Sequence, residues 1–82
     1  MKKMQEAVIN RINFLCNQKN YSYYMLSCKS GMSLTTLMNI MDGNSKNPGM
    51  LSVYKICRGL EISLHDFFDD DVFNELENEI ED

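Results

Sequence analysis

Apolar positions recur along the chain at helical spacing, in short blocks that polar turn residues separate. Residues 4–18 carry Val8, Ile12 and Leu15 at steps of four and three, which puts them on one face of a helix. A second block with helical spacing covers residues 50–60. No segment has the pattern of a β-strand. We therefore expect an all-α fold.

Between these blocks, serine and glycine mark the ends of two short helices. Ser22 and Ser33 are good N-caps for helices over about 23–30 and 34–42. Gly31 and Gly43 follow these helices, and glycine ends helices well because it adopts a left-handed conformation without strain. The pattern predicts two short helices joined across Gly31.

Two further signals concern packing in the second half of the chain. Ser63 is the expected N-cap of a fifth helix that runs to about Asp69. Gly59 lies inside the helix over 50–60, where glycine lowers helix stability. We therefore expect another helix to approach closely at Gly59.

The last residues form a separate amphipathic segment. Its apolar positions lie three and four apart and predict a sixth helix, with acidic residues on the other face. These positions are Val72, Phe73, Leu76 and Ile80. An isolated helix this short is marginal in water, so its apolar face must pack on something. A second copy of the chain is the favoured partner, and packing on its own domain is the alternative. We therefore divide the chain into a domain over residues 1–70 and an acidic C-terminal helix over residues 71–82.

Charge is distributed unevenly along the 82 residues, which are enough for one domain. The formal net charge is −4, but all eight Lys and Arg residues lie at or before Arg58. Only three acidic residues occur before Asp66, whereas nine occur from Asp66 to Asp82. The chain is a mildly basic domain followed by an acidic tail, a distribution that permits nucleic-acid binding.

Several classes of site find no support in the sequence. Cys16, Cys28 and Cys57 are far apart and His65 is the only histidine, whereas a zinc site needs paired ligands at short spacing. No nucleophile–base pair and no Gly-rich phosphate loop occurs. No apolar run approaches the ~20 residues of a membrane span. We expect a cytoplasmic protein that is not an enzyme and has no metal, cofactor, small-molecule ligand or membrane contact.

A set of residues between Arg11 and Phe68 occurs in a specific order and spacing. They are Arg11, Ile12, Leu15, Ser22 to Lys29, Gly31, Met32, Ser33, Leu37, Asn39, Ile40, Gly43, Asn47, Pro48, Lys55, Ile56, Cys57, Leu60, Ile62, Ser63, Leu64, Asp66, Phe67 and Phe68. In these marks the chain resembles the Cro/C1-type helix-turn-helix family, also called the XRE family. The resemblance implies a lambda-repressor-like domain of five helices whose third helix reads DNA in the major groove.

The chain departs from this family at a few positions. Many members have glutamine, which touches a phosphate, where this chain has Tyr23, whose hydroxyl can still donate one hydrogen bond. A buried arginine–glutamate pair is replaced by Cys16 and Met41, for which we expect an apolar contact; such replacements are often neutral or stabilising. Asp42 stands where a basic or neutral residue is common, and it would repel phosphates.

The resemblance assigns roles on the third helix and its surroundings. The base-reading residues are Leu34, Thr35, Met38 and Asn39. The phosphate-binding residues are Tyr23, Ser33, Thr36, Ser45, Lys46 and Asn47. Asparagine pairs bidentately with adenine, and helix N-termini favour anions. The alternatives are that Leu34 and Met38 are ordinary surface apolar residues and that Asn39 and Lys46 are merely solvated.

Two functions compete at this stage. The first is a bacterial or phage transcriptional regulator that binds a pseudo-palindromic operator in double-stranded DNA as a homodimer. We favour a repressor over an activator. The second is a protein-interaction module, such as an antitoxin, in which DNA binding is weak or secondary. The acidic tail and the apolar residues of the third helix favour the second.

Overall fold

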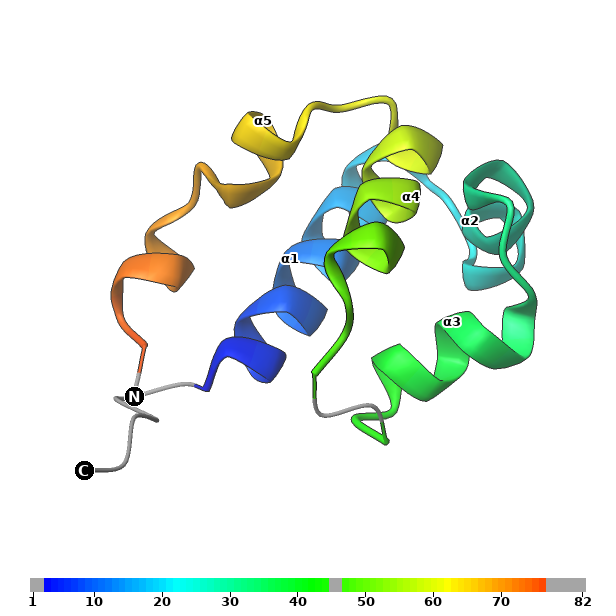
Figure 1. Ribbon diagram of the computed structural model, residues 1–82. Coiled ribbons are helices and arrows are strands. Elements are labelled where there is room, and N and C mark those ends of the chain that lie inside the picture. Colours follow the sequence, from blue (N-terminus) through cyan, green and yellow to red (C-terminus); the bar gives the residue numbers. More distant parts are fainter. Residues whose placement is uncertain (1–2, 45–46, 77–82) are drawn as a thin grey trace.

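The computed structural model describes residues 3–44 and 47–76, and this part of the chain is all-helical. Five α-helices follow one another: α1 (Met4–Lys19), α2 (Tyr23–Ser30), α3 (Leu34–Met41), α4 (Met50–Leu60) and α5 (Leu64–Phe68). A 3₁₀ turn, η1 (Asp71–Asn74), follows α5. Figure 1 shows α3 and η1 on opposite sides of the molecule, with α1 and α4 between them. The all-α prediction is confirmed. None of these helices is long and apolar enough to cross a membrane.

The three predicted serine caps are present. Ser22 Oγ accepts a hydrogen bond from the backbone N–H of Met25 at 3.1 Å. Ser33 Oγ accepts one from the backbone N–H of Thr36 at 3.1 Å. Ser63 Oγ does the same for Asp66 at 3.0 Å. Each bond satisfies an N–H group that would have no partner in the first turn of a helix, so local chemistry fixes where these helices begin.

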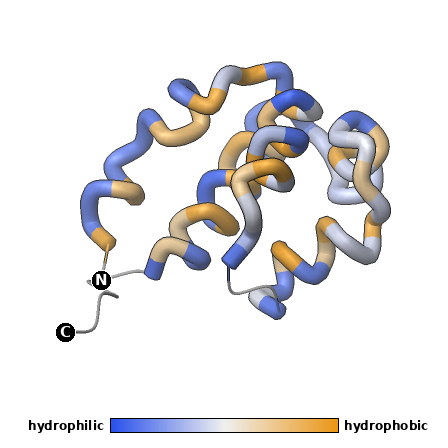
Figure 2. Tube along the Cα trace, viewed as in Figure 1, coloured by the Kyte–Doolittle hydropathy of each residue, from blue (hydrophilic) through white to orange (hydrophobic). Residues whose placement is uncertain are grey.

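One buried apolar cluster joins all five helices. Figure 2 shows hydrophobic and hydrophilic stretches alternating along the helices, as expected when each helix has one buried face. The cluster consists of Val8, Ile12, Leu15, Cys16, Leu26, Leu37, Ile40, Val53, Ile56, Cys57, Leu60 and Phe67. Cys16 lies in it and Met41 packs against it, so both residues take part in apolar packing, as expected. Met50, an apolar position of α4, is instead 61% exposed.

Helices α2 and α4 touch at Gly59, as the sequence predicted. A Cβ atom added at Gly59 would fall on Ser30 Oγ, and it would lie 3.0 Å from Ser30 N and 3.2 Å from the carbonyl carbon of Lys29. Ser30 Oγ is buried and makes no hydrogen bond. The missing side chain at Gly59 thus lets the end of α2 lie directly on α4.

Arg11 connects α1 to the end of α5. Its Nε donates to the carbonyl of Phe67 at 2.8 Å, and its Nη2 donates to the carbonyl of Asp66 at 2.7 Å. Its Nη1 lies 3.2 Å from a carboxylate oxygen of Asp70, and the arginine side chain is only 10% exposed. A cation at the C-terminal end of a helix meets the partial negative charge of the unpaired carbonyls. Arg11 is therefore a structural residue that fixes α5.

The segment after α5 turns back onto its own domain. Instead of an α-helix, Asp71–Asn74 forms a 3₁₀ turn, and the Asp70 side chain accepts a hydrogen bond from the N–H of Val72 at 2.9 Å. The ring of Phe73 lies 4.9 Å from that of Phe68 and 6.0 Å from that of Phe67, between centroids. Phe73 therefore packs on its own core, the alternative that the sequence left open. Val72 and Leu76 are half-buried, and Ile80 lies outside the described residues.

Candidate nucleic-acid interface

A tight turn between α2 and α3 sets the candidate reading helix. Gly31 has a φ of 68°, and its N–H bonds to the carbonyl of Cys28. The N–H of Met32 bonds to the carbonyl of Ser27 at 3.1 Å, so the end of α2 is closed by a glycine C-cap. Leu26 of α2 and Leu37 of α3 are both fully buried. The turn and these two leucines hold α3 with one face in the core and the other in solvent.

The predicted base-reading residues lie on this outer face. Thr35 and Asn39 are exposed, Leu34 is 40% exposed, and Met38 is half-buried. The buried Leu37 and Ile40 take the opposite face. The structure thus brings the four candidates together on one helix surface, with Met38 the least accessible of them.

The start of α3 offers hydrogen-bond donors to an anion. The backbone N–H groups at the first positions of an α-helix have no partner within the helix. Ser33 caps the N–H of Thr36, and its hydroxyl donates to Thr36 Oγ1 at 2.8 Å. Both residues are exposed. The hydroxyl of Thr36 remains as a donor, while that of Ser33 is already used.

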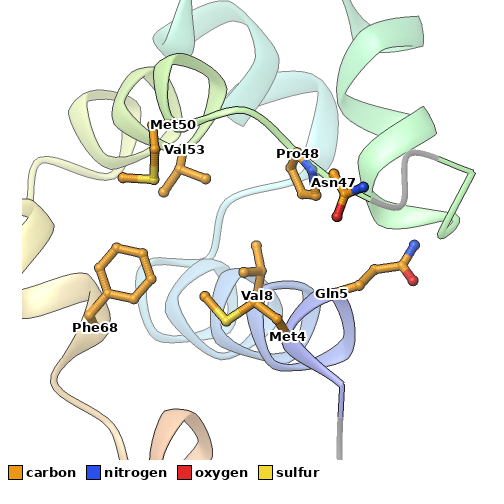
Figure 3. A pocket seen from close by; sticks show the side chains of 8 residues that line it. All are labelled: Met4, Gln5, Val8, Asn47, Pro48, Met50, Val53 and Phe68. Atoms are coloured by element: carbon orange, nitrogen blue, oxygen red, sulfur yellow. The ribbon is translucent and has the colours of Figure 1, made fainter. Parts of the chain in front are cut away.

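The loop after α3 is anchored at its first residue. Gln5 Nε2 donates to the carbonyl of Gly43 at 2.7 Å, which ties the C-terminal end of α3 to α1. Of the predicted phosphate contacts in this loop, Asn47 is exposed, and Ser45 and Lys46 lie outside the described residues. Figure 3 shows the Asn47 and Gln5 side chains on opposite walls of the same hollow.

Tyr23 has a different environment from the one expected. Its hydroxyl donates to Asn13 Oδ1 at 2.5 Å, and its ring packs against the core. The hydroxyl group that was expected to donate a hydrogen bond to a phosphate thus already donates one to Asn13. The sequence offered no signal for this pair, because Asn13 belongs to α1 and only the packing of α1 on α2 brings it there. With Asn17 and Ser22, these two residues line a hollow of about 320 Å³ at the start of α2.

Among the described residues near α3, charged side chains are few. The helix itself carries no charged residue, and Asp42 is exposed at its C-terminal end. Lys29, in the last turn of α2, is exposed, and its Nζ lies 5.3 Å from the centre of the Tyr21 ring. Arg11 is committed to α5 on the far side of the molecule. Within the described part of the chain, contact with phosphates would therefore depend on few cations and on backbone N–H groups.

A second hollow lies between α1 and the start of α4. It has a volume of about 140 Å³, and the residues that line it include Met4, Val8, Pro48, Val53 and Phe68. Figure 3 shows these side chains converging from α1, from the segment before α4, from α4 and from the end of α5. Drug-sized ligands occupy pockets of about 300–1,000 Å³, so this hollow is too small for most cofactors.

Two of the three thiols, those of Cys16 and Cys57, belong to the core, whereas Cys28 is exposed. Burial raises the pKa of the Cys16 thiol above its usual value and raises that of Cys57 to about 11. A thiol with a raised pKa is a poor nucleophile and a poor metal ligand at neutral pH. Within residues 3–44 and 47–76, no three His, Cys, Asp or Glu side chains lie together as a metal site would need.

Comparison with known proteins gives one informative similarity. No protein-family model matches the chain, and no curated protein matches it. A solved structure, that of prophage Lp1 protein 11, superposes on 93% of this chain and on 100% of its own length with a TM-score of 0.79. The two sequences are 33% identical. The chain therefore belongs to the same protein family as prophage Lp1 protein 11.

Proposed function

We propose that this protein is a phage-associated transcriptional regulator that binds a specific double-stranded DNA sequence through α3. The observation that carries the proposal is the two-sided character of α3. Its inner face is held by Leu37 and Ile40 in the core, while Thr35 and Asn39 on the outer face meet solvent. A helix held in this way after a tight turn can enter the major groove, which is wide enough to admit it.

Each exposed residue of α3 has a plausible partner on DNA. Asn39 carries the donor and acceptor that pair with the major-groove edge of adenine, Thr35 can bond a base or a phosphate, and Leu34 can touch a thymine methyl group. The N–H groups at the start of α3 and the exposed hydroxyl of Thr36 can donate hydrogen bonds to a phosphate. The part of the acidic segment that the structure describes, around η1, lies on the opposite side of the molecule from α3, where its carboxylates do not oppose binding.

The test is binding to DNA from just upstream of the protein's own gene, measured by fluorescence anisotropy at several salt concentrations. Asn39→Ala should cost about 1–3 kcal/mol and relax specificity at one base position. Lys46→Ala should weaken binding to all sequences and lower the salt slope by about one. Asn10→Ala, which changes an exposed asparagine on α1, is the matched control and should leave binding unchanged. Equal affinity of the Asn39→Ala variant and the parent would reject the assignment of α3.

A protein-interaction module, such as an antitoxin, is the second candidate. It is favoured by the absence of Lys and Arg from α3, by the exposed Asp42, and by the apolar Leu34 on the outer face. A regulator that binds DNA shows affinity that falls steeply with salt, whereas an apolar protein interface is far less sensitive. Absence of salt-dependent binding to any duplex would decide for the second candidate.

A further inference from the structure

Helix α4 carries an apolar face that nothing in the described structure covers. Met50, Leu51 and Tyr54 are 61%, 66% and 43% exposed. Tyr54 is three residues from Leu51 and four from Met50, so the three side chains are neighbours on the surface of the helix. Leu51 and Tyr54 point away from the buried Val53 and Ile56, and Met50 lies at the edge of this surface, next to the hollow that it lines together with Val53. A contiguous group of large exposed apolar residues commonly marks an interaction surface. We call these three residues, together with Arg58, the α4 face.

The charges around the α4 face differ between its two ends. Arg58 lies one turn beyond Tyr54, exposed, with its guanidinium carbon 5.9 Å from the centre of the Tyr54 ring. At the other end, Met50 borders a broad hollow of about 530 Å³ that is also lined by Asp69 and Asp71. Both carboxylates are exposed, whereas Asp70 in the same hollow is paired with Arg11. The face thus has a basic end, an apolar middle and an acidic end.

We propose that the α4 face binds the α4 face of a second copy, with the two helices antiparallel. This rests on the proposed function and names the surface of its dimer. An α-helix rises 1.5 Å per residue, so Arg58 and Met50 each lie about 6 Å from Tyr54 along the axis, in opposite directions. A two-fold axis that passes beside Tyr54 therefore sets Arg58 of each copy over Met50 of the other. Arg58 then faces the hollow that holds the partner's Asp69 and Asp71.

The charge pattern decides the occupant and the orientation. In a two-fold interface the same patch is used by both subunits, so the patch must be complementary to itself. The α4 face meets this condition when the helices are antiparallel, because each basic end meets an acidic end. Parallel helices would set Arg58 against Arg58 and the carboxylates against one another, which is unfavourable. A patch of this size is small for a stable interface, so we expect a dissociation constant on the order of 1–100 μM.

The predicted tail interface is a weaker choice. Phe73, the largest apolar residue predicted to mediate dimerisation, already packs on Phe67 and Phe68 of its own chain. Using it between copies would uncover part of the core. The α4 face can be buried without any rearrangement of the described residues.

The first test is sedimentation of the full chain from low to high micromolar concentration. The parent should show a monomer–dimer equilibrium, and Leu51→Gln and Tyr54→Gln should each weaken association at least tenfold. Glutamine is a good helix former without charge, so these changes preserve α4. Tyr24→Gln is the matched control, because Tyr24 is a 67% exposed tyrosine on α2 outside the α4 face. Circular dichroism should show the same helicity for all variants.

The second test exchanges charges. Arg58→Glu should weaken association at least fivefold, and adding Asp69→Lys and Asp71→Lys to the same chain should restore it, since each altered end again meets its opposite. A parent that stays monomeric at high micromolar concentration, or a dimer that Leu51→Gln and Tyr54→Gln leave intact, overturns the proposal. If Leu51→Gln weakens the dimer but Asp69→Lys and Asp71→Lys do not restore association of the Arg58→Glu variant, the antiparallel arrangement is overturned.

Failure of this inference can be told from failure of the proposed function. Binding of the same variants to a duplex with a single half-site depends on α3 alone and should be unchanged by Leu51→Gln or Tyr54→Gln. Half-site binding without the α4 dimer rejects only the dimer surface. An α4 dimer without salt-dependent binding to DNA keeps the surface and rejects the regulator.

Discussion

Gly59→Ala tests the contact between α2 and α4, and two opposing effects determine its outcome. Alanine is better than glycine inside a helix by about 1 kcal/mol. Against this, the new Cβ would lie 3.0 Å from Ser30 N and 3.2 Å from the carbonyl carbon of Lys29, which are backbone atoms that cannot rotate away. Overpacking of this kind costs about 1–3 kcal/mol, and contact with backbone belongs at the upper end. We expect a net loss of about 2 kcal/mol, a fall in Tm of about 8–16 °C for a domain of this size.

Thermal and urea unfolding followed by circular dichroism measure this loss. Gly31→Ala is an informative comparison, because nothing lies within 4 Å of its added Cβ and only its φ of 68° opposes a side chain. It should cost about 1 kcal/mol, most of which Gly31→Asn should recover, since asparagine tolerates that conformation. Adding Ser30→Ala to Gly59→Ala removes the unpaired Ser30 Oγ from the clash and should recover part of the loss. A Gly59→Ala variant as stable as the parent would refute the close approach of α2.

Four further results are expected. Arg11→Met should lower the free energy of unfolding by about 2–4 kcal/mol, because it removes two charge-assisted hydrogen bonds to the end of α5, whereas Arg58→Met should change it by less than about 0.5 kcal/mol. Ellman's reagent should titrate Cys28 rapidly in the folded protein and the other two thiols only after unfolding, since Cys28 alone is exposed. Burial raises the pKa of Cys57 from 9.0 to about 11, so the folded state keeps a proton that the unfolded chain gives up; the free energy of unfolding in urea should be at its full value below pH 9 and fall between pH 9 and 11. Asp42→Asn should stabilise α3 by about 0.3–1 kcal/mol through the helix dipole and should tighten any DNA binding, as calorimetry and anisotropy would show.

Helix ends and the glycine contact were predictable because their causes lie within a few residues. Ser22, Ser33 and Ser63 satisfy N–H groups three residues ahead, so the cap is visible in the sequence itself. Gly59 was informative because a glycine inside an otherwise regular helix lowers its stability and so indicates that another element approaches closely. The sequence could not say that this neighbour is Ser30.

Contacts that join distant segments escaped the sequence analysis. Arg11 reaches carbonyls more than fifty residues away, and an arginine in a first helix is indistinguishable from a DNA contact until α5 is in place. Tyr23 was assigned to phosphate from its place at the start of α2, but its hydroxyl bonds to Asn13 of α1. In both cases a polar side chain has several possible partners, and tertiary packing chooses among them.

The tail shows how an apolar stripe alone misleads. Val72, Phe73 and Leu76 have helical spacing, and of these Phe73 packs against the core, whereas Val72 and Leu76 are half-buried. The spacing did not indicate that Asp70 would accept the N–H of Val72 and start a tight turn, which returns Phe73 to its own core. The exposed face of α4 was missed for a related reason, since the apolar pattern does not show which apolar residues of α4 other elements cover.

The bonds from Arg11 to α5 also have a consequence for synthesis on the ribosome. Helix α1 is made first, but its Arg11 has no partner until residues 66–70 have been added, and the fully buried Phe67 arrives at the same stage. Phe67 belongs to the same buried cluster as Ile12 and Leu15, so until then this cluster is incomplete. We therefore expect this domain to complete its folding only after residues 66–73 have left the exit tunnel, and we expect a nascent chain stalled before that point to bind chaperones.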